Sequence, residues 1–222
     1  MPSLAFVSPK GGVGKSTAAL LLALGLAELG QTVAMIDADP NKPLQHWASL
    51  PGRPAGISVH PAPMSEDVAD AVREARRRKP DWLIFDTEGS IRGAMGLRTM
   101  QADLVLTPLA LSAIEVMQAL KASELVARFG ARGGHRPRHL CLLTRLPAAP
   151  DPGLLKSVVD RLRAHSMALL PTPLLDQPAW RQLFENPHRG GGAGGGEAAR
   201  RNAAAYVAAV RSAAQASSSM SQ

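Results

Sequence analysis

A glycine-rich loop between an apolar run and a helical stretch constrains the fold of this chain more than any other feature. Residues 3–8 read SLAFVS, residues 9–17 read PKGGVGKST, and residues 16–29 have the composition of a helix. Backbone N–H groups of such a loop, together with the positive end of the helix that follows, can surround a phosphate group. The order of strand, glycine loop and helix therefore predicts a phosphate-binding α/β domain.

Further apolar runs alternate with helical stretches along the chain, which predicts a parallel sheet wrapped on both sides. We expect a three-layer, doubly wound α/β fold of the P-loop NTPase class, with a mostly parallel sheet and helices on both faces. Residues 1–215 would form a single domain, residues 190–196 (GGGAGGG) a flexible connector within it, and residues 216–222 a disordered polar tail. The expected strands cover 3–8, 32–37, 57–60, 82–86, 103–108, 139–144 and 168–170, and the expected helices cover 16–29, 65–79, 92–101, 113–129, 152–165, 178–184 and 197–214.

The composition excludes several classes of protein. Cys141 is the only cysteine, so the chain cannot form an intrachain disulfide, a four-cysteine zinc site or a self-contained iron–sulfur site. The longest apolar run covers residues 18–27, which is well short of the roughly 20 residues needed to span a bilayer. We therefore expect a reducing, cytoplasmic setting and no membrane partner.

The charge is distributed unevenly along the chain. Residues 1–127 contain 12 basic and 13 acidic side chains, whereas residues 128–222 contain 13 basic and 5 acidic ones. All of the excess positive charge therefore lies in the C-terminal portion, which suggests that this portion approaches a polyanion such as nucleic acid. The alternative is that abundant arginine covers an ordinary solvated surface.

The side chains of the glycine loop suit a nucleotide. Lys15 can reach the β- and γ-phosphates, and the Ser16 hydroxyl can ligate Mg²⁺. The usual P-loop has glycine at the position where this chain has Pro9. The nucleotide-binding candidates in the loop are Lys10, Gly11, Gly12, Val13, Gly14, Lys15, Ser16 and Thr17.

The segment KGGVGKS (residues 10–16) resembles the deviant Walker A motif of the ParA/MinD superfamily of P-loop ATPases. The resemblance implies that Lys10 reaches across an ATP-sandwich homodimer to the partner's phosphates and that Lys10 and Lys15 both act in catalysis. A second cation at that place would offset the charge that develops on the transferred phosphoryl group. The alternative is that Lys10 binds phosphate within its own subunit.

Acidic residues at the ends of two expected strands extend the resemblance. The pattern DADP at 37–40 is similar to the family's next motif, which implies that Asp39 orients the attacking water and that Asp37 supports Mg²⁺ through water. Asp86, which ends the run WLIFD, resembles the Walker B aspartate that holds the metal's hydration shell. Mg²⁺ keeps several waters and needs only one or two carboxylates, so Ser16, Asp37 and Asp86 suffice as a metal site. Glu88 either assists this site or is simply solvated.

Absences narrow the choice within the superfamily. A single cysteine excludes the iron–sulfur branch, and the polar C-terminal end differs from the basic amphipathic membrane helix of MinD proteins. The small ParA type remains, including plasmid partition ATPases and ParA-like accessory proteins of conjugative transfer. This resemblance implies an ATPase that uses ATP and Mg²⁺, dimerises, binds DNA non-specifically on the nucleoid, and hydrolyses ATP slowly under stimulation by a small ParB-like partner. The alternative is an ATP-dependent recruitment or positioning protein for a conjugative-transfer complex or another protein cargo.

The expected C-terminal helix carries the main candidates for DNA contact. Arg200 and Arg211 are eleven residues apart and therefore share a helical face, with Arg201 beside them. Arg181 and Arg189 are weaker candidates. Such arginines suit non-specific phosphate contacts, although the alternative is an amphipathic helix with solvated arginines. The opposing apolar stripe comprises Ala199, Ala203, Tyr206, Val207 and Val210.

Two residues are candidates for contact with adenine. Thr144 and Arg145 lie at the end of an expected strand, near the position where related proteins hold the base, so the resemblance implies that they bind nucleotide. Trp180 is expected to pack against its neighbours rather than to bind a ligand.

Overall fold

Six parallel strands form one sheet in the computed structural model, which describes residues 1–64, 66–88, 102–185 and 196–219. Their order across the sheet is β3-β2-β4-β1-β5-β6, and this confirms the expected doubly wound arrangement. The four central strands are buried along their whole length, which explains why their sequences are continuous apolar runs. The strands are β1 (Ser3–Phe6), β2 (Val33–Ala38), β3 (Ile57–Pro61), β4 (Trp82–Thr87), β5 (Leu104–Leu109) and β6 (Arg138–Leu143).

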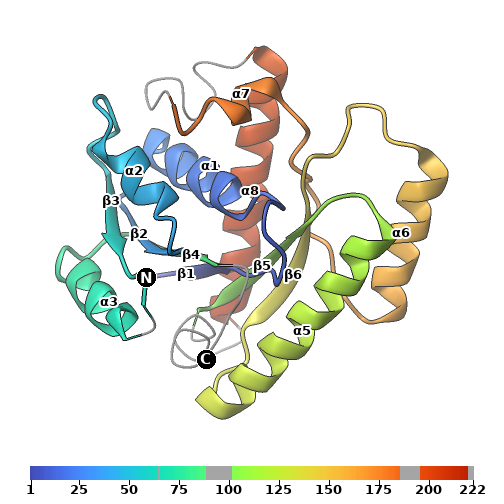
Figure 1. Cartoon of the computed structure of the whole chain (residues 1–222), viewed down its shortest axis with the longest axis horizontal. Helices are drawn as coiled ribbons and strands as arrows, with labels where there is room; N and C mark the ends of the chain where they lie inside the picture. The colour runs from blue at the N-terminus through green and yellow to red at the C-terminus, as the bar shows by residue number, and fades with distance from the viewer. Residues whose placement is uncertain (65, 89–101, 186–195, 220–222) are drawn as a thin grey trace.

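Helices cover both faces of the sheet (Figure 1). One face packs against α1 (Lys15–Glu28), α2 (Pro43–Ser49), α7 (Pro178–Arg181) and α8 (Glu197–Ser219). The other face packs against α3 (Asp67–Arg77) and α5 (Ala113–Gly133), and α6 (Pro152–Ala164) lies beside α5 over β6. The three-layer architecture is therefore as expected from the sequence.

Helix α8 is anchored to α1 by close packing. The apolar stripe expected on the C-terminal helix is buried, including Tyr206 and Val207. The Tyr206 hydroxyl donates a hydrogen bond of 3.1 Å to the Ala18 carbonyl in the interior of α1. Gly25 lies directly under Val207, because a Cβ built on Gly25 would come within 2.5 Å of Val207 Cγ2. The absence of a side chain at Gly25 therefore sets how closely the two helices approach.

The structure departs from the sequence-based expectation in several segments. Helix α8 continues to Ser219, so residues 216–219 are helical and do not belong to a disordered tail. Residues 168–170 form a single bridge, between Leu169 and Cys141, in place of a strand. Helix α2 was not expected, and α7 is shorter than the predicted 178–184. The expected helix 92–101 and residues 190–195 of the connector lie outside the described residues. Among the helices that the structure describes, none is long and apolar enough to cross a bilayer.

Replacing Gly25 with Ala should destabilise the protein. Alanine in a helix interior is normally favoured over glycine by about 1 kcal/mol. Overpacking against Val207 is expected to cost about 1–3 kcal/mol and to outweigh this gain. Urea unfolding should therefore give a lower free energy of unfolding for Gly25→Ala.

The control is Gly196→Ala, because a Cβ at Gly196 would meet nothing within 4 Å. In a Val207→Ala background the Gly25→Ala substitution should become neutral or stabilising. An equal loss of stability in both backgrounds would show that the contact with Val207 does not limit the approach of α8.

Candidate phosphate and nucleotide site

The glycine loop leaves the carboxyl end of β1 and turns directly into α1. Gly12 and Gly14 have φ values of 74° and 93°, in the left-handed region that side chains disfavour. A Cβ on Gly12 would meet nothing within 4 Å, and one on Gly14 would only touch Thr144 at 3.7 Å. The backbone conformation of the loop, rather than a lack of space, therefore requires glycine at these two positions.

The N-terminus of α1 is left open to an anion. Gly14 occupies the N-cap position, no side chain caps the helix, and its first turn contains no acidic residue. Free N–H groups and the positive end of the helix dipole therefore remain available. The Thr144 hydroxyl donates a hydrogen bond of 2.8 Å to the Val13 carbonyl and so ties the loop to the end of β6.

Lys15 is held beneath the loop. Its side chain is buried, and its ammonium group donates a hydrogen bond of 3.0 Å to the Lys10 carbonyl. Burial lowers the pKa of Lys15, and the carboxylates of Asp86, Asp39 and Glu88 oppose this effect. Lys15 therefore lies within electrostatic reach of Asp86 and Asp39, and also of Glu88, whose part in the site the sequence left open.

Asp86 is the most strongly perturbed group of the site. It lies at the carboxyl end of β4, in register with Asp37 on β2 and Phe6 on β1. Burial raises the pKa of Asp86 to about 7, and the approach of the Ser16 hydroxyl and then of Lys15 only partly offsets the rise. Neither carboxylate oxygen makes a well-formed hydrogen bond within the described residues. A buried carboxylate of this kind fits a hydrated cation, which would supply the missing partners.

Asp37 and Asp39 are both engaged by backbone groups. The Asp37 carboxylate accepts a hydrogen bond of 2.8 Å from the Gln45 N–H and so caps α2. Burial raises the pKa of Asp37, and the hydrogen bond from Gln45 is the largest opposing effect. Asp39 accepts hydrogen bonds from the Asn41 backbone and side chain at 2.8 and 3.0 Å. The metal role of Asp37 and the water-orienting role of Asp39 stay predictions.

Lys10 has a partner that the sequence did not reveal. Its ammonium group forms an ion pair with Glu115 in the first turn of α5, where Lys10 is half-exposed and Glu115 is almost fully buried. The second Glu115 oxygen has no hydrogen-bond partner within the described residues. The spacing of Ser112 and Glu115 is typical of a helix capping box, and Ser112 does accept from the Glu115 N–H. That local pattern gives no sign of a contact with residue 10.

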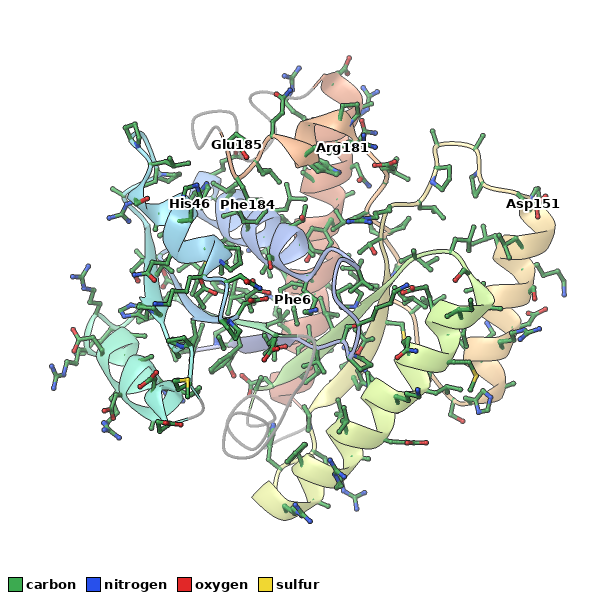
Figure 2. The ribbon with its side chains drawn as sticks, viewed as in Figure 1. Phe6, His46, Asp151, Arg181, Phe184 and Glu185 are labelled. Carbon is green, nitrogen blue, oxygen red and sulfur yellow. The ribbon has the colours of Figure 1, made fainter. Side chains whose placement is uncertain are left out.

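A cavity of about 420 Å³ adjoins the glycine loop and contains both adenine candidates, Thr144 and Arg145. Its outer wall comes from the segment after residue 173, and Figure 2 labels Arg181 and Phe184 there. Trp180 packs in this wall as expected, with its indole N–H donating to the Leu175 carbonyl at 3.0 Å. The sequence did not identify the other residues of this wall as contacts. They are Leu174, Leu175, Asp176, Gln177, Arg181 and Phe184.

The arginines proposed for DNA lie in different settings. Arg200 and Arg211 line one groove of about 460 Å³ between α1 and α8, which agrees with a shared helical face. Arg201 pairs with Glu197 one turn away, and Arg189 lies outside the described residues. Arg181 pairs with Asp176 at 3.4 Å beside the nucleotide-sized cavity, which places it at that cavity rather than in the α8 row.

Comparisons with known proteins match both the sequence and the fold. A family model described as the CobQ/CobB/MinD/ParA nucleotide-binding domain matches residues 4–179. Protein ParA of Rhizobium radiobacter is 28% identical over 189 residues, covering 83% of each chain. Protein virC1 of Rhizobium rhizogenes is 31% identical over 57% of this chain and 56% of its own. The apo structure of Cyanothece McdA has a TM-score of 0.76 at 18% sequence identity, and the match covers 95% of this chain and 99% of that one. The structure of an ATP complex of a Cyanothece McdA variant has a TM-score of 0.73 at 18% sequence identity, and the match covers 95% of this chain and 96% of that one.

Replacing Asp86 with Asn should stabilise the nucleotide-free protein at pH 8. The pKa of Asp86 is about 7 in the fold against an ordinary value of 3.8, so the stability of the fold falls as pH rises through 7. An amide cannot ionise, so Asp86→Asn should raise the free energy of unfolding at pH 8 by about 2–4 kcal/mol. The difference should shrink as the pH falls and vanish below about pH 3, where the carboxyl is protonated in both the folded and the unfolded state.

Urea unfolding in the presence of EDTA, at several pH values between about 3 and 8, measures this difference. Asp160→Asn is the control, because Asp160 is exposed and paired with Lys156 on α6. Parallel pH profiles for the wild type and Asp86→Asn would show that Asp86 does not carry a buried charge at pH 8.

Proposed function

Because the chain belongs to the CobQ/CobB/MinD/ParA nucleotide-binding domain family, we propose that it is a ParA-type ATPase that segregates or positions plasmid DNA. In this proposal it binds ATP and Mg²⁺, dimerises, binds DNA non-specifically and hydrolyses ATP slowly. The observation that carries the proposal is the Asp86 carboxylate, which is buried near Lys15 and has no well-formed hydrogen bond within the described residues, under a glycine loop that opens onto an uncapped helix. Buried cationic and anionic groups of this kind suit a phosphate and its metal ion.

The nucleotide is assigned to two adjoining regions. The phosphates lie against residues 11–17, where loop N–H groups and Lys15 neutralise them. The adenosine part lies in the 420 Å³ cavity, against Thr144 and Arg145. Ser16 and Asp86 hold Mg²⁺ and its water shell, with Asp37 acting through water. Bound Mg²⁺ supplies charge neutralisation to the β- and γ-phosphates.

Hydrolysis is assigned to residues at the carboxyl edge of the sheet. Asp39 orients the attacking water in line with the γ-phosphate, and Lys15 stabilises the charge that develops on the transferred group. Asp39 lies half-buried just after β2 and within electrostatic reach of Lys15, and this position supports the role. Release of Asn41 from the Asp39 carboxylate would free an acceptor for the water.

Dimerisation is assigned to the face that contains Lys10. For Lys10 to reach the partner's phosphates it must leave Glu115, so nucleotide and partner together replace one ion pair by a stronger set of charges. Two large apolar side chains, Ile114 and Met117, are exposed on either side of Glu115 in α5. The exposure of these two side chains supports the assignment, because exposed apolar groups near such a site favour association with a second subunit that would bury them.

DNA contact is assigned to the arginines of α8, chiefly Arg200 and Arg211 and with them Arg201, and to Arg189, which precedes α8 in the sequence.

A second candidate function is recruitment or positioning of a protein cargo, such as a conjugative-transfer complex. The groove between Arg200 and Arg211 favours this second candidate, because its floor is formed by apolar and small residues such as Leu29 and Val207. A small partner protein would stimulate hydrolysis in either case.

Lys15→Ala should abolish measurable ATP binding, because it removes the buried ammonium group that faces the phosphates. A loss of at least about 100-fold in affinity, or roughly 3 kcal/mol, is expected in a titration with fluorescent ATP. Lys156→Ala is the matched control, since Lys156 is exposed on α6 and pairs only with Asp160 within the described residues. Unchanged binding by Lys15→Ala would contradict the phosphate assignment.

Asp39→Ala should separate ATP binding from hydrolysis. Turnover is expected to fall about 100-fold, because the attacking water is no longer oriented, while ATP affinity is kept. The ATP-bound dimer should accumulate, as measured by light scattering, and should stay on non-specific DNA. Turnover equal to that of the wild type would remove the water-orienting role from Asp39.

A further inference from the structure

A basic cleft runs along the edge strand β3, away from the nucleotide site. Its volume is about 460 Å³, and both Arg53 and Arg78 line it. Ser58 and His60 of β3 add polar groups, which lie 3.2 Å apart from Oγ to Nε2. We call these four residues, with the neighbouring Arg76 and Lys79, the β3-edge cleft. Arg53 precedes β3 and Arg78 precedes β4, so both guanidinium groups come from segments at the amino end of these strands, whereas the glycine loop follows the carboxyl end of β1.

Within the described residues no arginine or lysine of this cleft forms an ion pair, although the carboxylate of Glu74 acts on His60. Arg76, Arg77, Arg78 and Lys79 are consecutive and exposed, and within the described residues only Arg77 forms an ion pair, with Glu74. The Arg53 guanidinium donates to the Ile57 carbonyl at 2.8 Å, which leaves its positive charge without a carboxylate in the part of the chain that the structure describes.

The helix dipole does not account for this charge. Basic residues in the last turn of α3 complement the dipole, but each such residue contributes only about 0.3–1 kcal/mol, and the effect fades within a turn. Arg53 belongs to a different segment, yet it faces the same cleft as Arg78. Two separate parts of the chain therefore bring unpaired guanidinium groups to one concave surface, which indicates an anionic ligand.

The surface does not suit addition of a peptide strand. On the open side of β3, the Ile57 N–H already donates to the Pro54 carbonyl at 3.3 Å, the Ile57 carbonyl accepts from Arg53, and Pro61 has no N–H. None of the large apolar side chains exposed in the described residues lines the cleft. A protein interface normally has such apolar anchors, whereas contacts with a phosphodiester backbone need only cations and hydrogen-bond donors.

We propose that the β3-edge cleft binds the phosphodiester backbone of DNA, as a contact separate from the α8 arginines. The inference rests on the proposed DNA binding and gives it a location. Guanidinium groups bind phosphate through paired hydrogen bonds, and Ser58 and His60 can add further ones. The pKa of His60 is lowered by burial and then by Arg78, and Glu74 opposes this effect only in part, so the positive charge of the cleft comes from the arginines. Because Arg53 and Arg78 precede their strands and Lys10 follows β1, DNA and a second subunit contact different ends of the strands in this proposal.

The test is a salt titration of ATP-dependent retention on non-specific DNA, with the full chain carrying Arg53→Glu and Arg78→Glu. Retention should fall at least tenfold at 0.1 M salt, and the slope of log affinity against log salt should decrease by about 2, for two lost phosphate contacts. Arg161→Glu with Arg163→Glu is the matched control, because both lie exposed on α6 and the charge change is the same. This control should keep the wild-type slope.

Two further variants keep the proposal open to refutation. Arg53→Lys with Arg78→Lys should keep most of the slope, and Arg76→Glu with Lys79→Glu should weaken retention without touching the Arg53–Ile57 hydrogen bond. A wild-type salt slope in both Arg53→Glu with Arg78→Glu and Arg76→Glu with Lys79→Glu would refute DNA binding at the cleft. Loss of retention only in Arg200→Glu with Arg211→Glu would assign DNA contact to α8 alone. Absence of ATP-dependent retention in the wild type would refute the proposed function itself. Binding of anionic phospholipid vesicles that depends on Arg53 and Arg78, without any effect on DNA, would assign the cleft to a membrane surface.

Discussion

Parallel pairing of β1, β2 and β4 is the constraint on which the rest of the structure depends. The register places Phe6, Asp37 and Asp86 side by side, so residues from three distant segments meet at one edge of the sheet. The glycine loop leaves β1 at this edge, and its lysine enters the field of the carboxylates. The fold thereby brings an ammonium group and a buried carboxylate, which has no well-formed hydrogen bond within the described residues, under an open helix terminus. This arrangement is unfavourable for stability in isolation, because burying an incompletely compensated charge costs free energy, and a bound phosphate with its cation would relieve it.

The regular parts of the fold were predictable because they depend on local signals. Continuous apolar runs marked strands that are buried on both faces, and the glycine loop marked the entry to α1. The acidic residues at strand ends were predictable as a group because parallel strands end at the same edge. Short elements were less predictable: α2 depends on capping by Asp37 from outside its own sequence, and the bridge at Leu169 depends on the neighbouring β6.

Contacts between distant residues account for what the sequence could not provide. Glu115 has the local signature of a helix cap, and only the folded chain shows that it also binds Lys10, 105 residues away. The wall of the nucleotide-sized cavity comes from a segment with little periodicity, and its position follows from backbone hydrogen bonds of Leu146 with Leu174 and Asp176. The charge count was also misleading in one respect. Acidic residues early in α3 offset most of the basic residues at its end, so a charge count over residues 1–127 does not show that cations gather at the β3-edge cleft.

The central claim is that the Asp86 carboxylate is kept for a cation that accompanies a nucleotide. Calorimetry of ATP binding in the presence of Mg²⁺, at pH 6 in buffers of different ionisation enthalpy, tests it most directly. With a pKa of about 7, Asp86 is largely protonated at pH 6, so binding should release close to one proton per nucleotide. The release should disappear in Asp86→Asn and without Mg²⁺. Tight binding of ATP with the same proton exchange in the wild type and Asp86→Asn would contradict the account.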